Sequence, residues 1–214
     1  MPDERPGREG GVRDTRRRER TTAVATAALR LFLDHGIEAA SIDDIAARAG
    51  IAKGSFYTYF KDKPDVVEAL LAPVSEPVRA ALTRCESALR EVRDPDALTG
   101  AYQRLAADCA AVLIENPGIA LLYLQESRAP ATAARRPIVT LAREIRERAV
   151  ALTWVAREHG ALKPIDARVS ALAVIGAVEM MLFRALSGDE LGDPVHVTDG
   201  LIELVLHGIA VPGR

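Results

Sequence analysis

The stretch Ser41–Lys63, S-I-D-D-I-A-A-R-A-G-I-A-K-G-S-F-Y-T-Y-F-K-D-K, predicts two short helices separated by a tight turn, with a third helix beginning at its end. Ser41 is a favourable N-cap, and Asp44 three residues later completes a capping-box pair. Gly50 follows an apolar helical face and can adopt the left-handed conformation that ends a helix. The second helix is therefore expected over residues 52–60.

The second of these helices has an unusual composition for a core element. It holds four of the nine aromatic residues of the chain, and with the segment after it three of the four lysines. Phe56 and Phe60 are four positions apart and can both face the core, which leaves Tyr57 and Tyr59 off that face. A short helix with exposed polar side chains, braced by a preceding helix, is typical of a helix-turn-helix that enters the DNA major groove.

Three motifs make this pattern more specific. They are A-A-L-R-L-F-L-D-H-G at 27–36, S-I-D-D-I-A-A-R-A-G-I at 41–51 and K-G-S-F-Y-T-Y-F-K-D-K at 53–63. Together they resemble the N-terminal domain of TetR-family transcriptional regulators, with the likeness covering residues 20–71. The resemblance implies a cytoplasmic homodimer that binds a palindromic DNA operator as a repressor and is released by a small-molecule effector.

Two positions depart from the family pattern. Ala40 and Ala52 stand where a hydroxyl-bearing residue is common, so Ala52 brings no capping side chain and no phosphate contact to the second helix. The alternative to DNA recognition is a three-helix core without a DNA role. The clustering of lysine and tyrosine around one short helix argues against that alternative.

The expected DNA contacts divide into two groups. Side chains on the exposed side of the second helix can reach base edges, and a glycine there lets the backbone approach closely. Hydroxyl and ammonium groups around the rim can hold phosphates, although ring packing alone is the alternative role for the two tyrosines. The base group comprises Lys53, Gly54, Ser55 and Thr58; the phosphate group comprises Ser41, Tyr57, Tyr59, Lys61, Lys63 and, from the family resemblance, Thr22.

Composition supports a globular protein with a locally basic part. The chain has 214 residues, of which 49% are hydrophobic and 27% charged, and its net charge of −2 excludes a globally basic nucleic-acid binder. Residues 1–63 carry 12 Lys or Arg and 10 Asp or Glu, whereas residues 64–214 carry 16 and 20. The N-terminal part is therefore expected to face a polyanion. The longest apolar runs are broken by Glu or Arg, so no membrane span is expected.

The first residues combine proline, glycine and mixed charges, and residues 1–17 predict a disordered arm. The first helix is expected from Arg18 to His35. Two interpretations of the junction between arm and helix remain open: a basic extension that touches DNA phosphates or the minor groove, and a solvated tail, for which Asp14 and Glu19 argue. The arginines concerned are Arg13, Arg16, Arg17, Arg18 and Arg20.

The rest of the chain predicts only helices, so the fold class is all-α with about nine helices. The DNA-binding domain is expected over residues 18–71 and an effector-binding and dimerisation domain over 72–214. Pro73 and Pro77 predict a kink or a break in the fourth helix near residues 72–75, between these domains. The later helices are expected at 77–92, 95–115, 117–128, 131–159, 166–187 and 194–208.

The helix expected at 166–187 is apolar on nearly every face and needs cover all round. The family resemblance implies that the last two helices form a homodimer, and a protein that reads two half-sites also needs two copies. The alternative is that both helices pack inside one subunit. The candidate interface residues are Val178, Met181, Leu201, Leu204 and Val205.

An effector pocket is also implied by the resemblance. Scattered aromatic and soft side chains with a few polar groups are typical of small-molecule sites, although each of them could equally be plain core. These side-chain types favour a small apolar or aromatic effector. The pocket candidates are Tyr102, Tyr123, Gln125, Glu126, Trp154, Met180 and Phe183.

No motif for catalysis, metal binding or a cofactor is visible, because the four histidines lack partners at ligand spacing and no nucleophile signature occurs. We therefore expect no enzyme, no cofactor and no metal. Cys85 and Cys109 are expected as reduced thiols rather than as a disulfide. The rival functions are a helical small-molecule carrier with a non-functional DNA-binding domain, and an architectural DNA-binding protein without an effector.

Overall fold

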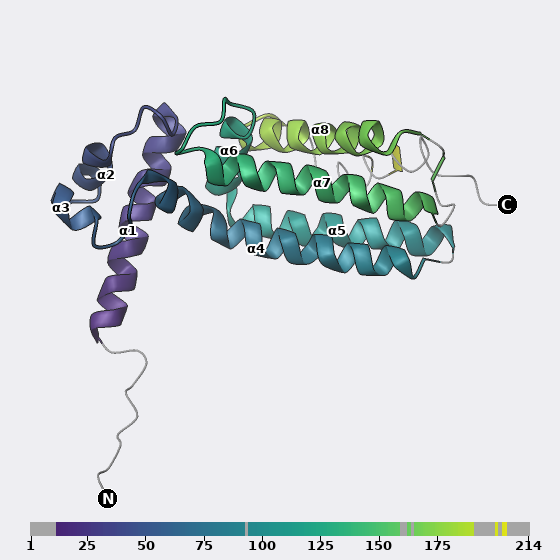
Figure 1. Cartoon of the computed structure of the whole chain (residues 1–214), viewed down its shortest axis with the longest axis horizontal. Helices are drawn as coiled ribbons and strands as arrows, with labels where there is room; N and C mark the ends of the chain where they lie inside the picture. Colours follow the sequence, from purple (N-terminus) through teal and green to yellow (C-terminus); the bar gives the residue numbers. More distant parts are fainter. Residues whose placement is uncertain are drawn as a thin grey trace, which may run out of the picture.

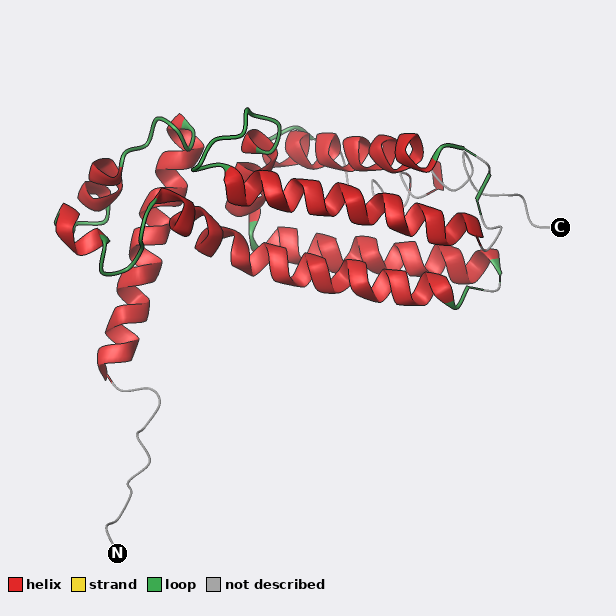
Figure 2. Ribbon diagram, in the orientation of Figure 1, coloured by secondary structure: helices red, strands yellow, loops and turns green. Residues whose placement is uncertain are grey.

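The computed structural model describes residues 12–92, 94–158, 162–163, 165–190, 200 and 203–204. Every regular element named in this part of the chain is a helix, which confirms the all-α prediction (Figure 2). Figure 1 shows α1, α2 and α3 together at one end, and α4 leading from them into a bundle with α5, α7 and α8. The helices are α1 Val12–His35, α2 Ile42–Arg48, α3 Lys53–Phe56, α4 Lys63–Arg90, α5 Pro95–Glu115, α6 Pro117–Glu126, α7 Arg136–Glu158 and α8 Ala167–Leu186.

Local signals in the first domain are confirmed. Ser41 caps α2, and the reciprocal capping box with Asp44 is formed. Gly50 has φ +67, the left-handed conformation that turns the chain from α2 to α3. Phe56 and Phe60 are both buried, with ring centroids 6.0 Å apart, and anchor α3 against the core of the domain.

Helix α3 is shorter than expected. It spans Lys53–Phe56 instead of residues 52–60: Ala52 is its N-cap, without a side-chain hydrogen bond, and the chain continues after Phe56 in tight turns. The N–H of Thr58 donates to Ser55 O at 3.1 Å, and the N–H of Tyr59 donates to Phe56 O at 2.9 Å. These i to i+3 bonds keep the exposed residues on a helical path beyond the last α-helical residue.

Helix α1 begins earlier than expected, at Val12 instead of Arg18, so residues 12–17 of the predicted arm are helical. The arginine-rich start contains no glycine or proline after residue 11, and arginine is a good helix former. Asp14 lies in the first turn, where a negative charge stabilises the helix dipole. The remainder of the predicted arm, residues 1–11, lies outside the described residues.

The expected break in the fourth helix is absent, since α4 continues through Pro73 and Pro77 to Arg90. Both prolines are exposed, so water can hydrate the carbonyl groups that lose an N–H partner. The opposite face buries an unbroken apolar stripe that includes Val74 and Val78, and this packing holds the helix together. The two domains therefore share one continuous helix.

The bundle is built by packing of α4 against α5 and α7, and of α7 against α8. Helix α6 connects it to the first domain, because α6 contacts α1, α4, α5, α7 and α8. Of the predicted last helix, 194–208, the structure describes only Gly200, Glu203 and Leu204, which are helical. Leu201 and Val205, two predicted interface residues, lie outside the described residues.

Helix α8 is apolar but poorly covered by the described structure. By length and composition alone it could cross a membrane, contrary to the sequence expectation, but one such helix is weak support for a membrane protein. Only 11% of its 18-residue window is buried inside this single chain. The cover that the sequence requires on all faces of this helix is therefore incomplete within the described part of one chain.

Candidate nucleic-acid interface and effector cavity

The four residues predicted to face DNA bases are brought together on one exposed surface. Lys53, Gly54 and Ser55 lie on α3, Thr58 lies in the turn after it, and all four are exposed. The space where a Cβ atom of Gly54 would lie is open, so another molecule can approach the backbone closely there. Phe56 holds this surface in place from the buried side.

Lys53 has a partner within the protein that the sequence did not suggest. Its Nζ donates to Asp43 Oδ2 at 2.9 Å, and both side chains are exposed. This hydrogen bond and the charge of Asp43 hold the pKa of Lys53 above its usual range. A DNA base that takes Lys53 as a donor must therefore compete with Asp43.

The predicted rim residues differ in how free they are. Tyr57 is exposed and packs edge-on against Phe56, with ring centroids 5.5 Å apart, while Tyr59 is half-buried against the core. The side chains of Lys61 and of Thr22 on α1 are exposed.

Ser41 has both a structural role and an exposed position. Its Oγ donates to Asp44 Oδ2 at 2.6 Å and accepts from the N–H of Asp44 at 3.1 Å. The Ser41 hydroxyl and the Ser41 N–H, which donates to Asp44 Oδ2 at 3.1 Å, together lower the pKa of the Asp44 carboxyl. The hydroxyl of Ser41 thus starts α2, and a phosphate would have to share it with Asp44.

The ammonium group of Lys63 is partly engaged within the protein. Its Nζ donates to Glu38 O at 3.1 Å and to Ala40 O at 3.0 Å. The loop between α1 and α2 presents these two carbonyl oxygens to the first turn of α4. Lys63 therefore ties the loop to α4 with two of its three N–H donors, and its phosphate contact stays a prediction.

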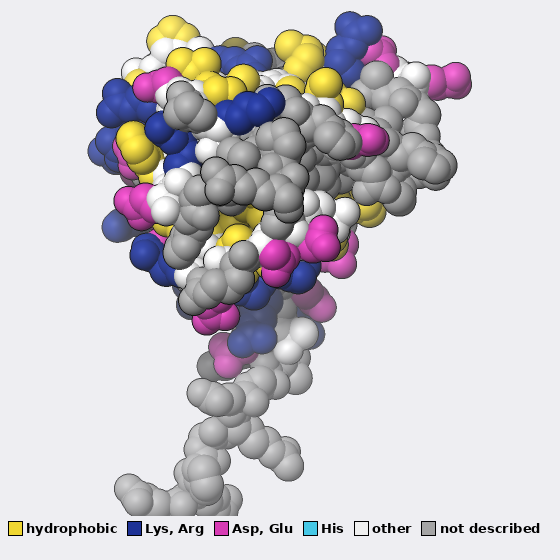
Figure 3. Space-filling view, turned by 90° about the vertical axis from the view of Figure 1, so that its right-hand side faces the viewer, with side chains coloured by type: hydrophobic (Ala, Val, Ile, Leu, Met, Phe, Trp, Pro, Cys, Tyr) yellow, Lys and Arg dark blue, Asp and Glu magenta, His cyan; other side chains and the backbone are white. Residues whose placement is uncertain are grey.

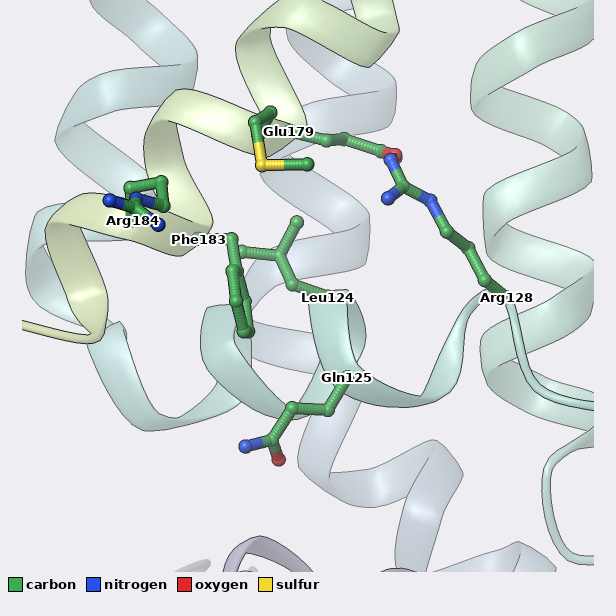
Figure 4. A pocket seen from close by; sticks show the side chains of 7 residues that line it. Leu124, Gln125, Arg128, Glu179, Phe183 and Arg184 are labelled. Atoms are coloured by element: carbon green, nitrogen blue, oxygen red, sulfur yellow. The ribbon is translucent and has the colours of Figure 1, made fainter.

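A cavity of about 430 Å³ lies between α6 and α8 (Figure 4). Three predicted pocket residues, Gln125, Met180 and Phe183, line it. Sequence reasoning missed Leu124, Arg128, Glu179 and Arg184, which complete the lining. The available signal for Glu179 was its position as the one carboxylate within an otherwise apolar helix.

The lining residues Arg128 and Glu179 form a polar cluster with Tyr123, a predicted pocket residue that does not itself line the cavity. The Tyr123 hydroxyl donates to Glu179 Oε1 at 3.0 Å, and Arg128 Nη2 donates to Glu179 Oε2 at 2.9 Å. Figure 4 shows Arg128 and Glu179 pointing toward each other across the cavity mouth. Burial, followed by the nearby Glu179 charge, raises the pKa of Tyr123, so its hydroxyl stays a donor at neutral pH.

Two predicted pocket residues do not reach this cavity. Tyr102 packs against the core from α5, and burial raises the pKa of its hydroxyl. Trp154 is 49% exposed on α7, with the Arg157 guanidinium 4.9 Å from its ring centroid. The buried side of α7 carries Leu152, Thr153, Val155 and Ala156, and Trp154 lies on the opposite, exposed side.

Glu126 belongs to the junction between the domains instead of the cavity. It is 5% exposed, and its Oε1 accepts the N–H of Ile37 at 2.8 Å. Its Oε2 accepts from Nε of Arg135, which also lies 3.8 Å from Glu38. A Cβ atom at Gly36, where φ is +82, would lie only 3.2 Å from Glu126 Oε1. The end of α6 is thereby fastened to the loop that follows α1.

The predicted dimer residues that are described lie on accessible apolar surface. Val178 is 44% exposed, Met181 is partly exposed and Leu204 is 70% exposed. Val169 and Leu172 on α8 are exposed as well. Figure 3 shows hydrophobic side chains gathered along the upper edge of the molecule, the side on which α8 lies in Figure 1.

Comparison with known proteins agrees with this geometry. Residues 25–70 match the family described as "Bacterial regulatory proteins, tetR family". The HTH-type transcriptional repressor BepR of Brucella suis is 24% identical over 198 residues, which cover 90% of this chain and 88% of BepR.

Two crystal structures show the same fold. NalD, the secondary repressor of the MexAB-OprM multidrug efflux pump in Pseudomonas aeruginosa, has a TM-score of 0.70 at 22% identity, over 94% of this chain and all of NalD. FadR from Bacillus subtilis in complex with stearoyl-CoA has a TM-score of 0.64 at 19% identity, over 87% of this chain and 98% of FadR.

A helix-turn-helix unit joined by one continuous helix to an all-helical second domain defines the class of helix-turn-helix transcriptional regulators. The N-terminal domain of the chain matches the TetR family of these regulators over residues 25–70, and BepR is similar to the chain over 90% of its length.

Proposed function

We propose that the protein is a transcriptional repressor that binds a palindromic DNA operator and leaves it when a small molecule enters the cavity between α6 and α8. The observation that carries the proposal is the exposed surface of Lys53, Gly54, Ser55 and Thr58, held by the buried Phe56 at the tip of the molecule. This surface has the size and polarity of a recognition helix for the major groove. The relative BepR is a transcriptional repressor by name.

The cavity favours an effector with an apolar body and a polar end. Leu124, Met180 and Phe183 supply apolar contact, while Glu179 and the exposed Arg128 supply an acceptor and a donor at the wall. A volume of about 430 Å³ suits a small organic molecule. FadR, which shares the fold, was crystallised with stearoyl-CoA, a molecule that also combines an apolar chain with a polar head. This refines the apolar or aromatic effector expected from the sequence.

Exposed apolar side chains on α8 support a homodimer. The exposed Val178 and the partly exposed Met181, which share a face by helical spacing, would leave water if a second copy packed on this helix. A two-fold dimer would place two α3 surfaces on two half-sites of one DNA duplex. We place the protein in the cytoplasm, where bacterial DNA lies, and assign it a binding function without catalysis.

Effector and DNA are proposed to communicate through α6. Leu124 and Gln125 line the cavity, and Glu126 next to them holds the N–H of Ile37 in the first domain. A shift of α6 on effector binding changes the position of α1 relative to the bundle, and with it the separation of the two recognition surfaces. The coupling is reciprocal, so operator DNA must weaken effector binding by the same factor.

The test begins with operator selection. A randomised DNA pool is incubated with the full-length protein, bound sequences are enriched, and the affinity of the consensus is compared with that of random DNA over a salt series. The proposal expects a palindromic consensus, and Lys53→Ala should weaken consensus binding about tenfold or more while relaxing the preference at one base pair per half-site. Lys163→Ala, in the second domain, is the control. Failure to enrich any sequence would refute the proposal.

A further inference from the structure

The start of α1 carries an arginine surface that the recognition helix does not include. Residues 14–20 are all exposed, and the first buried residue of the helix is Val24. The first turns of α1 extend past α3 and stand clear of both α3 and the bundle (Figures 1 and 2). At 1.5 Å per residue, the part of α1 before Val24 is about 18 Å long. This part of the helix does not contribute to the hydrophobic core, so packing does not explain its arginine pattern.

Three of its arginines lie on one face. Arg16, Arg17 and Arg20 are spaced like Val24 and the buried residues that follow it, at helical intervals of three or four. Further along, this face is buried against the first domain, where α1 contacts α2 and α4. The opposite face of α1 approaches α6, since Gly118 of α6 lies against Leu29 and Leu33.

The arginine face therefore lies on the side of α1 that carries α2 and α3. It continues this side of the molecule beyond the exposed surface of α3. In the part of the chain that the structure describes, none of the ion pairs involves Arg16, Arg17 or Arg20. The neighbouring acidic residues, Asp14 and Glu19, fall on the flanks of the face by helical spacing. Three guanidinium groups without carboxylate partners form a site that fits a row of phosphates.

We propose that Arg16, Arg17 and Arg20 bind the phosphate backbone of DNA outside each half-site, so that the protein contacts a longer duplex than its two recognition helices cover. This inference rests on the proposed DNA-binding function. A helix segment of about 18 Å matches about five base pairs at 3.4 Å each. The contact reads no base sequence; it adds affinity and salt dependence.

The experiment compares two duplexes with the full-length protein. Both contain the palindrome selected from the randomised pool, and one adds ten base pairs of arbitrary sequence at each end. We expect wild type to bind the longer duplex about tenfold more tightly at low salt, with a steeper dependence on salt concentration. Arg16→Ala/Arg17→Ala/Arg20→Ala should abolish this gain and leave affinity for the short duplex unchanged. Alanine preserves the helix, so loss of folding is not the cause.

A matched pair of single variants tests the face itself. Arg17→Ala should lower the gain from flanking DNA, whereas Arg18→Ala, the same charge change on the opposite side of the helix, should not. Equal binding of both duplexes by wild type would overturn the inference while the proposed function stands. Equal effects of the two single variants would also overturn it, since they would point to net charge alone. Absence of specific binding to either duplex would refute the proposed function together with the inference.

Discussion

Replacing Glu126 by alanine should lower the free energy of unfolding by roughly 4 kcal/mol. The change removes the acceptor of the buried Ile37 N–H, and an unsatisfied buried donor costs about 1–3 kcal/mol. It also removes the buried carboxylate that pairs with Arg135. Removing one partner of a fully buried ion pair costs about 3–5 kcal/mol. Arg135 is 16% exposed and retains a second carboxylate, Glu38, at 3.8 Å. The cost of losing the Glu126–Arg135 pair should therefore lie at the lower end of the range for buried pairs.

Glu126→Gln separates the two contributions. A glutamine keeps a carbonyl oxygen for the Ile37 N–H but loses the ion pair with Arg135, so its cost should be about half that of alanine. Glu144→Ala is the matched control, because Glu144 accepts two hydrogen bonds from Arg79 Nε in a pair whose side chains are 31% and 36% exposed. Loss of this accessible pair should cost about 1 kcal/mol or less.

Urea denaturation followed by circular dichroism measures all three variants. The operator affinity of the folded variants is measured as well. A change in this affinity would show that the contact between α6 and the first domain helps to position the DNA-binding surface. If Glu126→Ala cost no more than Glu144→Ala, the argument that burial makes the Glu126 contacts strong would be wrong. If it destabilised the protein but left the linkage between effector and operator unchanged, the proposed route through α6 would be wrong.

Three further predictions concern the recognition surface, the subunit contact and the buried thiols. Asp43→Asn should strengthen operator binding about two- to fivefold, because Lys53 no longer has a charged partner in the free protein; weaker binding in gel shifts would contradict this. Val178→Glu should raise the dimer dissociation constant more than about a hundredfold in sedimentation experiments, and an unchanged constant would exclude this part of α8 from the interface. Burial raises the pKa of the Cys85 and Cys109 thiols to about 11. The unfolded chain therefore loses these protons first, and stability should fall as pH rises from about 9 to about 11, less steeply in Cys85→Ala.

Local interactions made the first domain predictable from sequence. The capping box of Ser41 and Asp44, the turn at Gly50 and the pairing of Phe56 with Phe60 all join residues within four positions of one another or depend on one residue. Periodicity and caps carry such information directly. The base-facing set of α3 followed from the same short-range pattern.

Long-range contacts account for what the sequence did not reveal. Lys63 finds its carbonyl partners 23 and 25 residues away, and Glu126 reaches an N–H group 89 residues away. Arg128 and Glu179 meet across the cavity although 51 residues separate them. No spacing rule predicts such partners, because they depend on how whole helices pack. The break expected in α4 was wrong for a related reason: exposure of its prolines is a property of the packed bundle.

The prolines of α4 have a mechanical consequence. Because Pro73 and Pro77 are four residues apart, the carbonyl groups deprived of N–H partners, at Ala69 and Pro73, lie in one row along the solvent side of the helix. A rod weakened along one side bends readily in one plane and resists bending in the plane at right angles. The weak row lies within the first four turns of α4, where the helix passes from the first domain to the bundle. We expect any bending of α4 at this joint to move the first domain along a hinge-like arc.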